Sequence, residues 1–143
     1  MTVARILKEK GREVETAAPH HTLREVIARL AEKRLGALVV SDATRAPLGI
    51  VSERDIVRVL AERGPAVLDE PVSTHMTRNV QTVGEDASVD EVAATMTNSR
   101  FRHMPVVTEG KLVGIVSIGD VVRRQVDALH HEREALRTYI ASA

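Results

Sequence analysis

A chain of 143 residues with 43% hydrophobic residues can bury one compact core or two small ones, which excludes global disorder. Its 20 basic and 20 acidic residues balance, which argues against a general nucleic-acid or anionic-membrane surface, and one Phe and one Tyr leave no stacking platform for single-stranded nucleic acid. With no cysteine, no apolar signal core and no apolar run of bilayer length, we expect a cytoplasmic protein without thiol chemistry and without a membrane partner.

The first half of the chain, residues 1–62, alternates strand-like and helix-like segments. An N-terminal helix is expected at 2–10 and a strand at 14–16. Thr22 and Glu25 form a capping-box pattern ahead of apolar residues at helical spacing, which predicts a helix. The β-branched runs 37–40 and 48–51 predict two strands joined by a loop, and Ser52 opens a further helix.

The second half repeats this order after a linker at residues 63–79, in which Gly64 and two prolines interrupt the pattern. A short helix is expected near the end of this linker, at 72–76. The predicted elements of residues 80–125 are, in order, a strand at 80–82, a helix capped by Ser88 and Glu91, strands at 104–107 and 112–116, and a helix from Ser117.

The two halves are copies of one unit. Gly49–Asp55 and Gly114–Asp120 share five of seven residues. Upstream segments match at an offset of 66 that becomes 65 after the loop between the two strands, so the length difference falls in a loop. A unit of this size can hardly cover its own sheet, whereas two packed face to face can.

The duplicated β-α-β-β-α order, with Gly-Ile-Val-Ser-x-x-Asp at each last helix, resembles a tandem CBS-domain pair. The resemblance covers roughly residues 1–125 and implies an α+β fold of tandem CBS repeats, packed sheet to sheet by a pseudo-twofold and followed by a C-terminal helix at 126–143. It also implies a regulatory module, similar to stand-alone bacterial CBS pairs, that binds AMP, ATP or NAD(H), with AMP favoured. Such a module would sense energy or redox state, change conformation and signal to a regulated protein that the sequence does not identify.

The repeated Ser-x-x-Asp suits such a ligand chemically. At a helix start, the Asp carboxylate can accept hydrogen bonds from ribose hydroxyls, while the Ser hydroxyl and free backbone N–H groups can hold a phosphate. The alternative is that each pair only caps its helix.

The resemblance further implies two clefts, each shared between the repeats. One would place Ser52, Arg54 and Asp55 opposite Phe101, Arg102, His103 and Met104, and the other would place Ser117 and Asp120 opposite Leu35, Gly36 and Ala37. The arginines and His103 could converge on phosphates. Their alternatives are a solvated charge for Arg54 and a half-buried strand position for His103.

No motif of an enzyme is present: the sequence lacks a phosphate-binding glycine loop, a nucleophile elbow and a His-Glu-x-x-His zinc motif. His130 and Glu134 are one helical turn apart but have no third ligand, so no metal site is expected. The second hypothesis is therefore not an enzyme but a non-catalytic protein-interaction scaffold whose clefts are vestigial.

An apolar stripe continues past the second repeat through Val126, Leu129, Leu136 and Ile140. A helix that outruns its own domain has to bury such a stripe elsewhere. We expect a homodimer held partly by this helix, and the alternative is that the helix folds back on the N-terminal helix of its own chain.

Overall fold

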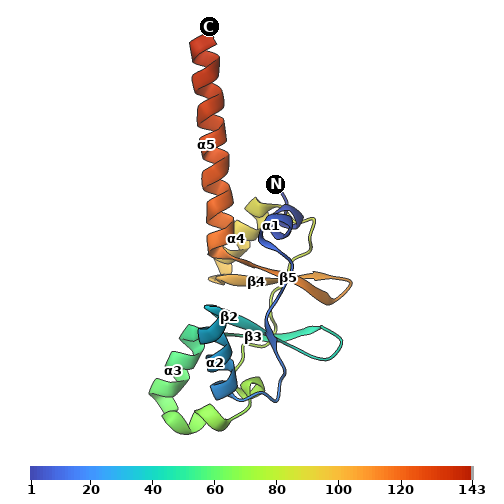
Figure 1. Cartoon of the computed structure of the whole chain (residues 1–143), viewed down its shortest axis with the longest axis vertical. Helices are drawn as coiled ribbons and strands as arrows, with labels where there is room; N and C mark the ends of the chain where they lie inside the picture. Colours follow the sequence, from blue (N-terminus) through green and yellow to red (C-terminus); the bar gives the residue numbers. More distant parts are fainter. Residues whose placement is uncertain (143) are drawn as a thin grey trace.

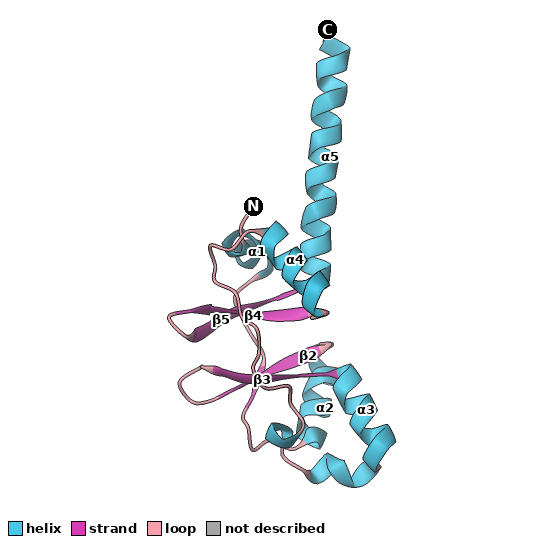
Figure 2. Ribbon diagram, turned by 180° about the vertical axis from the view of Figure 1, so that it is seen from behind, coloured by secondary structure: helices cyan, strands magenta, loops and turns pink. Residues whose placement is uncertain are grey.

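The structure is a computed structural model that describes residues 1–142. Two small sheets face each other in the middle of the molecule, and helices cover their outer sides (Figures 1 and 2). The first sheet has the order β1-β2-β3, from Thr16–Ala17, Ala37–Ser41 and Pro47–Ser52, and the second pairs β4, His103–Thr108, with β5, Lys111–Ser117. The predicted α+β fold of tandem repeats with a C-terminal helix is confirmed.

The predicted helices begin at their predicted caps. Helix α2 covers Leu23–Lys33 and α4 covers Val89–Ser99. The Ser88 hydroxyl accepts from the Glu91 backbone N–H at 3.0 Å, and the Glu91 carboxylate accepts from the Ser88 backbone N–H. The Thr22 hydroxyl likewise accepts from the Glu25 backbone N–H at the start of α2, but the Glu25 carboxylate does not accept from the Thr22 N–H. Of these two helices, only α4 therefore has a complete capping box.

The first strand of the second repeat is much shorter than predicted. Instead of a strand at 80–82, the structure has a single parallel bridge between Val83 and Val106. Val83 bonds to the Pro105 carbonyl and to the Val107 N–H. Continuing the ladder upstream would need an N–H from Pro105, which proline lacks. Val39 stands in this position in the first repeat, where β1 forms.

The segments that precede the repeats cross over. Helix α1, Val3–Lys10, packs Ile6 and Leu7 into the core of the second repeat. Conversely, the segment between the repeats forms two 3₁₀ helices, η1 at Pro65–Asp69 and η2 at Val72–Thr74, and contributes Val72 and Met76 to the core of the first repeat. This exchange ties the two halves together.

The remaining helices follow the Ser-x-x-Asp motifs. Helix α3 covers Glu53–Arg63, and α5 covers Ile118–Ser142. Only the beginning of α5 packs on the body of the molecule, and the rest projects away from it (Figure 1). Within residues 1–142, no helix combines the length and the apolar character that crossing a membrane requires.

Candidate functional site

Asp55 is fixed at the start of α3 by a complete capping box. Its Oδ2 accepts from the Ser52 N–H at 3.0 Å and from the Ser52 hydroxyl at 2.9 Å, and the Ser52 hydroxyl in turn accepts from the Asp55 N–H at 3.2 Å. Oδ1 accepts from Arg58, one turn along the same helix, whose side chain is exposed. Asp55 therefore does cap its helix, but this role leaves one carboxylate oxygen held only by a surface arginine.

Asp55 borders a cavity of about 580 Å³ between the repeats. The first repeat contributes Ser52, Arg54 and Asp55, and the second contributes Phe101, Arg102 and His103. The expected pairing of these two segments across the seam is thus present in the geometry. A cavity of this size lies within the range of small-molecule sites.

Three guanidinium groups give the cavity a positive character. Arg54, Arg100 and Arg102 line it together with the carboxylates of Glu53 and Asp55. Arg100 ends α4 in a left-handed conformation, with φ of 59°, and lines the cavity from there. The arrangement offers charge-assisted donors to an anion and a carboxylate acceptor to hydroxyl groups.

His103 lies between the two halves and is kept neutral. Burial lowers its pKa below the ordinary value of 6.5, and the ammonium of Lys10 lowers the pKa further. A Cβ added at Gly36 would lie 3.6 Å from His103 Cε1 and 3.2 Å from Glu53 Oε1, so the first repeat approaches His103 closely at this glycine. His103 is half-buried, yet it also faces the cavity.

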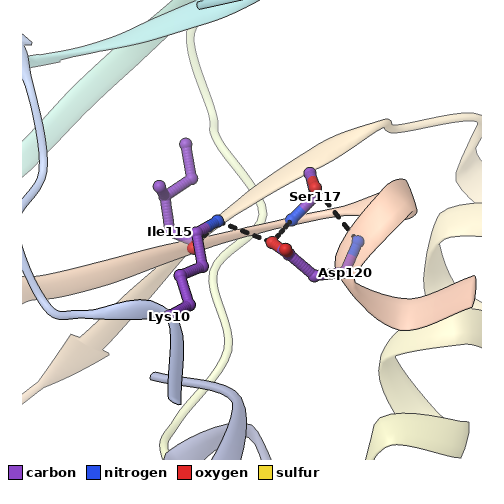
Figure 3. A network of polar contacts seen from close by, with 4 residues as sticks. All are labelled: Lys10, Ile115, Ser117 and Asp120. Carbon is purple, nitrogen blue, oxygen red and sulfur yellow. Dashed lines mark hydrogen bonds and ion pairs between the residues drawn. The ribbon is translucent and has the colours of Figure 1, made fainter. Parts of the chain in front are cut away.

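The second Ser-x-x-Asp motif caps its helix in a similar way, but its carboxylate is bound by a lysine. Asp120 Oδ2 accepts from the Ser117 N–H at 2.9 Å and from Lys10 Nζ at 2.6 Å (Figure 3). Lys10 also donates to the Ile115 carbonyl at 3.0 Å. Burial by itself would raise the pKa of Asp120, but the hydrogen bonds from Lys10 and from the Ser117 backbone outweigh it and hold the pKa below 3.8. The ammonium of the chain's own N-terminal helix therefore sits on this carboxylate.

Four predicted residues lie elsewhere than expected. Gly36 and Ala37 line the cavity beside Asp55 rather than a separate cleft around Asp120. Leu35 packs against the core of the first repeat, and the Met104 side chain is buried in the core of the second. The prediction already expected two unequal clefts, with Arg102 and His103 on one wall and Gly36 and Ala37 on the other, but it did not include the crossing of α1 onto the second half.

The sequence interpretation did not single out Lys10 or Arg100. Arg100 could have been found, because it follows α4 at the position that Arg34 has after α2, and both adopt positive φ. Lys10 had no such signal, since it is 110 residues from Asp120 and no local pattern connects the two.

Comparison with known proteins identifies the family. The CBS domain matches residues 3–62 and, a second time, residues 72–127. The chain belongs to the CBS-domain family. A similar solved structure is the CBS-domain protein ATU1752 of Agrobacterium tumefaciens, with 42% identity and a TM-score of 0.84 over 87% of this chain and 99% of that one.

Two other similar structures of CBS-domain proteins contain ligands. PAE2072 from Pyrobaculum aerophilum, complexed with AMP, is 33% identical with a TM-score of 0.75, over 84% of this chain and 89% of that one. The CBS-domain pair of MJ0100, in complex with 5′-methylthioadenosine and S-adenosylmethionine, is 29% identical with a TM-score of 0.80, over 90% of this chain and 98% of that one. Homologous CBS pairs thus bind adenosine-containing ligands, which supports the general class of regulatory, nucleotide-binding modules.

Proposed function

We propose that this CBS-domain protein binds one adenine nucleotide per chain in the cavity beside Asp55 and acts as a regulatory module without catalysis. The observation that carries the proposal is the cavity itself. It unites the Asp55 carboxylate of one repeat with Arg102 and His103 of the other. A ligand held by both repeats would bias their relative orientation, which is the change that a regulated protein could detect.

The charge of the cavity favours a phosphate-bearing ligand. Arg54, Arg100 and Arg102 can donate to phosphate oxygens, and Asp55 can accept from the ribose. The same three guanidinium groups would repel the sulfonium cation of S-adenosylmethionine. We therefore propose AMP as the preferred ligand, with ATP and NADH as the alternatives.

The stoichiometry of one follows from the second Ser-x-x-Asp motif. A ribose approaching Asp120 would have to displace Lys10, whose Nζ contacts both the carboxylate and the Ile115 carbonyl. The arginine that could compensate is also missing there, because Gly119 stands where α3 has Arg54. At the Asp55 cavity, by contrast, the free carboxylate oxygen is held only by the exposed Arg58, and Arg54 is present.

Calorimetric titration with AMP, ATP, NADH and S-adenosylmethionine tests this function. We expect AMP to bind at one site per chain, with S-adenosylmethionine much weaker and no nucleotide consumed. Native mass spectrometry shows whether the purified protein is free of ligand. If ligand-free protein gave no binding heat with any of the four compounds at millimolar concentration, the result would instead support the scaffold with vestigial clefts. Turnover that co-purifies with the protein would contradict the absence of catalysis.

The proposed module works in the cytoplasm, as a homodimer, on a regulated protein still to be identified. Pull-down with and without AMP, using Asp55→Ala as the nucleotide-blind control, would find a protein whose binding depends on the ligand. A partner captured equally by both proteins in both conditions would favour the scaffold.

A further inference from the structure

The free part of α5 presents an apolar stripe that its own chain leaves uncovered. Leu129 is 65% exposed and Leu136 is 57% exposed, although both are large aliphatic side chains. The stripe also contains Val122, Val126 and Ile140, all of them exposed. From Gln125 to Ser142 every residue of the helix is exposed, so nothing within residues 1–142 packs on this part of it.

The body of the molecule holds the opposite side of the helix. Val121 is buried beside α4, and Arg124 forms an ion pair with Glu9 of α1. On a helix Arg124 points away from Val122, Val126 and Leu129, and Val121 lies between Arg124 and the stripe. The stripe therefore cannot reach α1, and the fold-back alternative does not occur in this structure. A partner could cover the stripe without meeting the body.

The stripe has the repeat of a two-stranded coiled coil. Written as heptads, Val122, Leu129 and Leu136 occupy position d, and Val126, Arg133 and Ile140 occupy position a. In parallel coiled coils, leucine at d with β-branched residues at a favours two strands, and Leu129, Leu136, Val126 and Ile140 fit this combination. Arg133 is the single charged residue of the stripe, and one charged a position in such a seam costs stability but restricts the register.

The charged residues beside the stripe attract each other in a parallel pair of α5 helices and repel each other in an antiparallel pair. In a parallel pair, Glu132 at position g of one helix lies next to Arg137 at position e of the other, and symmetry makes this contact twice. In an antiparallel pair that places Val122 opposite Ile140, Glu132 would face Glu132, and Arg123 would face Arg137. The helix also carries four arginines and four acidic residues, which gives it no excess charge for an anionic membrane.

We propose that α5 of a second copy of this chain covers the stripe, in a parallel, in-register coiled coil that starts at Val122. Both bodies then lie at the same end of the helix pair, each on the side of α5 where it already packs. This proposal concerns assembly and does not depend on nucleotide binding at the Asp55 cavity.

Single cysteines give a direct test, because the chain has none of its own. Under mild oxidation, Leu136→Cys should cross-link to itself as a covalent dimer, whereas Thr138→Cys, on the outer face of the same helix, should remain largely monomeric. Cross-linking between Val122→Cys and Ile140→Cys in a mixture, without self-linking of Leu136→Cys, would show an antiparallel pair and overturn the proposal.

Sedimentation equilibrium of the full chain supplies the second test. Leu129→Glu with Leu136→Glu should raise the dimer dissociation constant at least about tenfold, because four leucine side chains leave the seam. Thr138→Glu is the matched control and should leave the constant unchanged. Both sites are exposed in the monomer, so circular dichroism should show an intact fold. A wild-type monomer at high concentration, or a dimer that the double variant does not weaken, would overturn the proposal.

Exchanging the charges of Glu132 and Arg137 then tests whether the two helices are parallel. Glu132→Arg alone should weaken the dimer, and addition of Arg137→Glu should restore it, because the exchanged pair again has opposite charges. Failure of the second change to restore affinity would contradict the parallel register.

Discussion

Lys10 donates a 2.6 Å hydrogen bond from its Nζ to Oδ2 of Asp120, across 110 residues of sequence. Asp120 is the repeat equivalent of Asp55, whose counterpart oxygen Oδ2 is held only by its own Ser52. One ion pair thus makes two copies of the same motif unequal, leaving Asp55 beside an open cavity and covering Asp120.

Substitutions on the two sides of the cavity should weaken one and the same binding event. Asp55→Ala and Arg102→Ala each remove a hydrogen bond involving a charged group, which should cost about 1.5–3 kcal/mol of binding free energy, or roughly 10-fold to 150-fold in affinity. Calorimetric titration with AMP measures both. Asp120→Ala is the control and should change the affinity far less. If Asp55→Ala and Arg102→Ala acted on separable sites, the shared cavity would not be the binding site.

Removal of the Lys10 ammonium should open the second position. In Lys10→Ala, the Asp120 carboxylate loses its 2.6 Å partner and becomes available to ligand hydroxyl groups. We expect the stoichiometry of AMP binding in calorimetric titration to rise from one per chain toward two. Lys8→Ala removes an exposed lysine of the same helix and should leave the stoichiometry at one. A single site in both variants would show that Lys10 only anchors α1.

Nucleotide binding should take up a proton at His103. Burial and Lys10 hold the pKa of His103 below 6.5 in the free protein, so the imidazole is neutral at pH 7. A phosphate placed beside it favours the protonated form and raises that pKa. Affinity should therefore increase as the pH falls from 8 toward 6, because binding is linked to protonation.

Titrations in two buffers of different ionisation enthalpy count the protons exchanged. His103→Gln keeps a hydrogen-bonding side chain but cannot titrate, so its proton uptake should be smaller by the His103 contribution. The phosphate itself can also titrate near this pH, and it does so equally with both proteins. An identical proton count for both would contradict a phosphate contact by His103.

Gly114 lets α1 reach the second sheet. A Cβ at this position would lie 2.6 Å from Leu7 Cδ2, and Leu7 is fully buried, so it has nowhere to move. Gly114→Ala should lower the free energy of unfolding by about 1–3 kcal/mol through overpacking, as measured by chemical denaturation. Gly119→Ala is the control, because the nearest atom to its Cβ would be Ser117 Oγ at an ordinary 3.6 Å. Equal stability of the two variants would show that α1 is not firmly held there.

The sequence by itself determined the repeated unit, the helix starts and the motif residues beside the cavity. These features are local: Ser88 caps α4 through a residue three positions away, and the strands follow from short β-branched runs. The shortening of the first strand of the second repeat follows from Pro105 in the neighbouring strand β4, a residue whose effect the prediction overlooked.

Only the tertiary structure decided which Ser-x-x-Asp is free. Helix α1 precedes the first repeat in sequence but packs on the second, where it brings Lys10 to Asp120 and fills the space over Gly114. No local pattern specifies such a contact, because its energy comes from burying Ile6 and Leu7 against residues far along the chain. The same packing turned Arg124 of α5 toward Glu9, and thereby left the stripe of Leu129 and Leu136 facing away from the body.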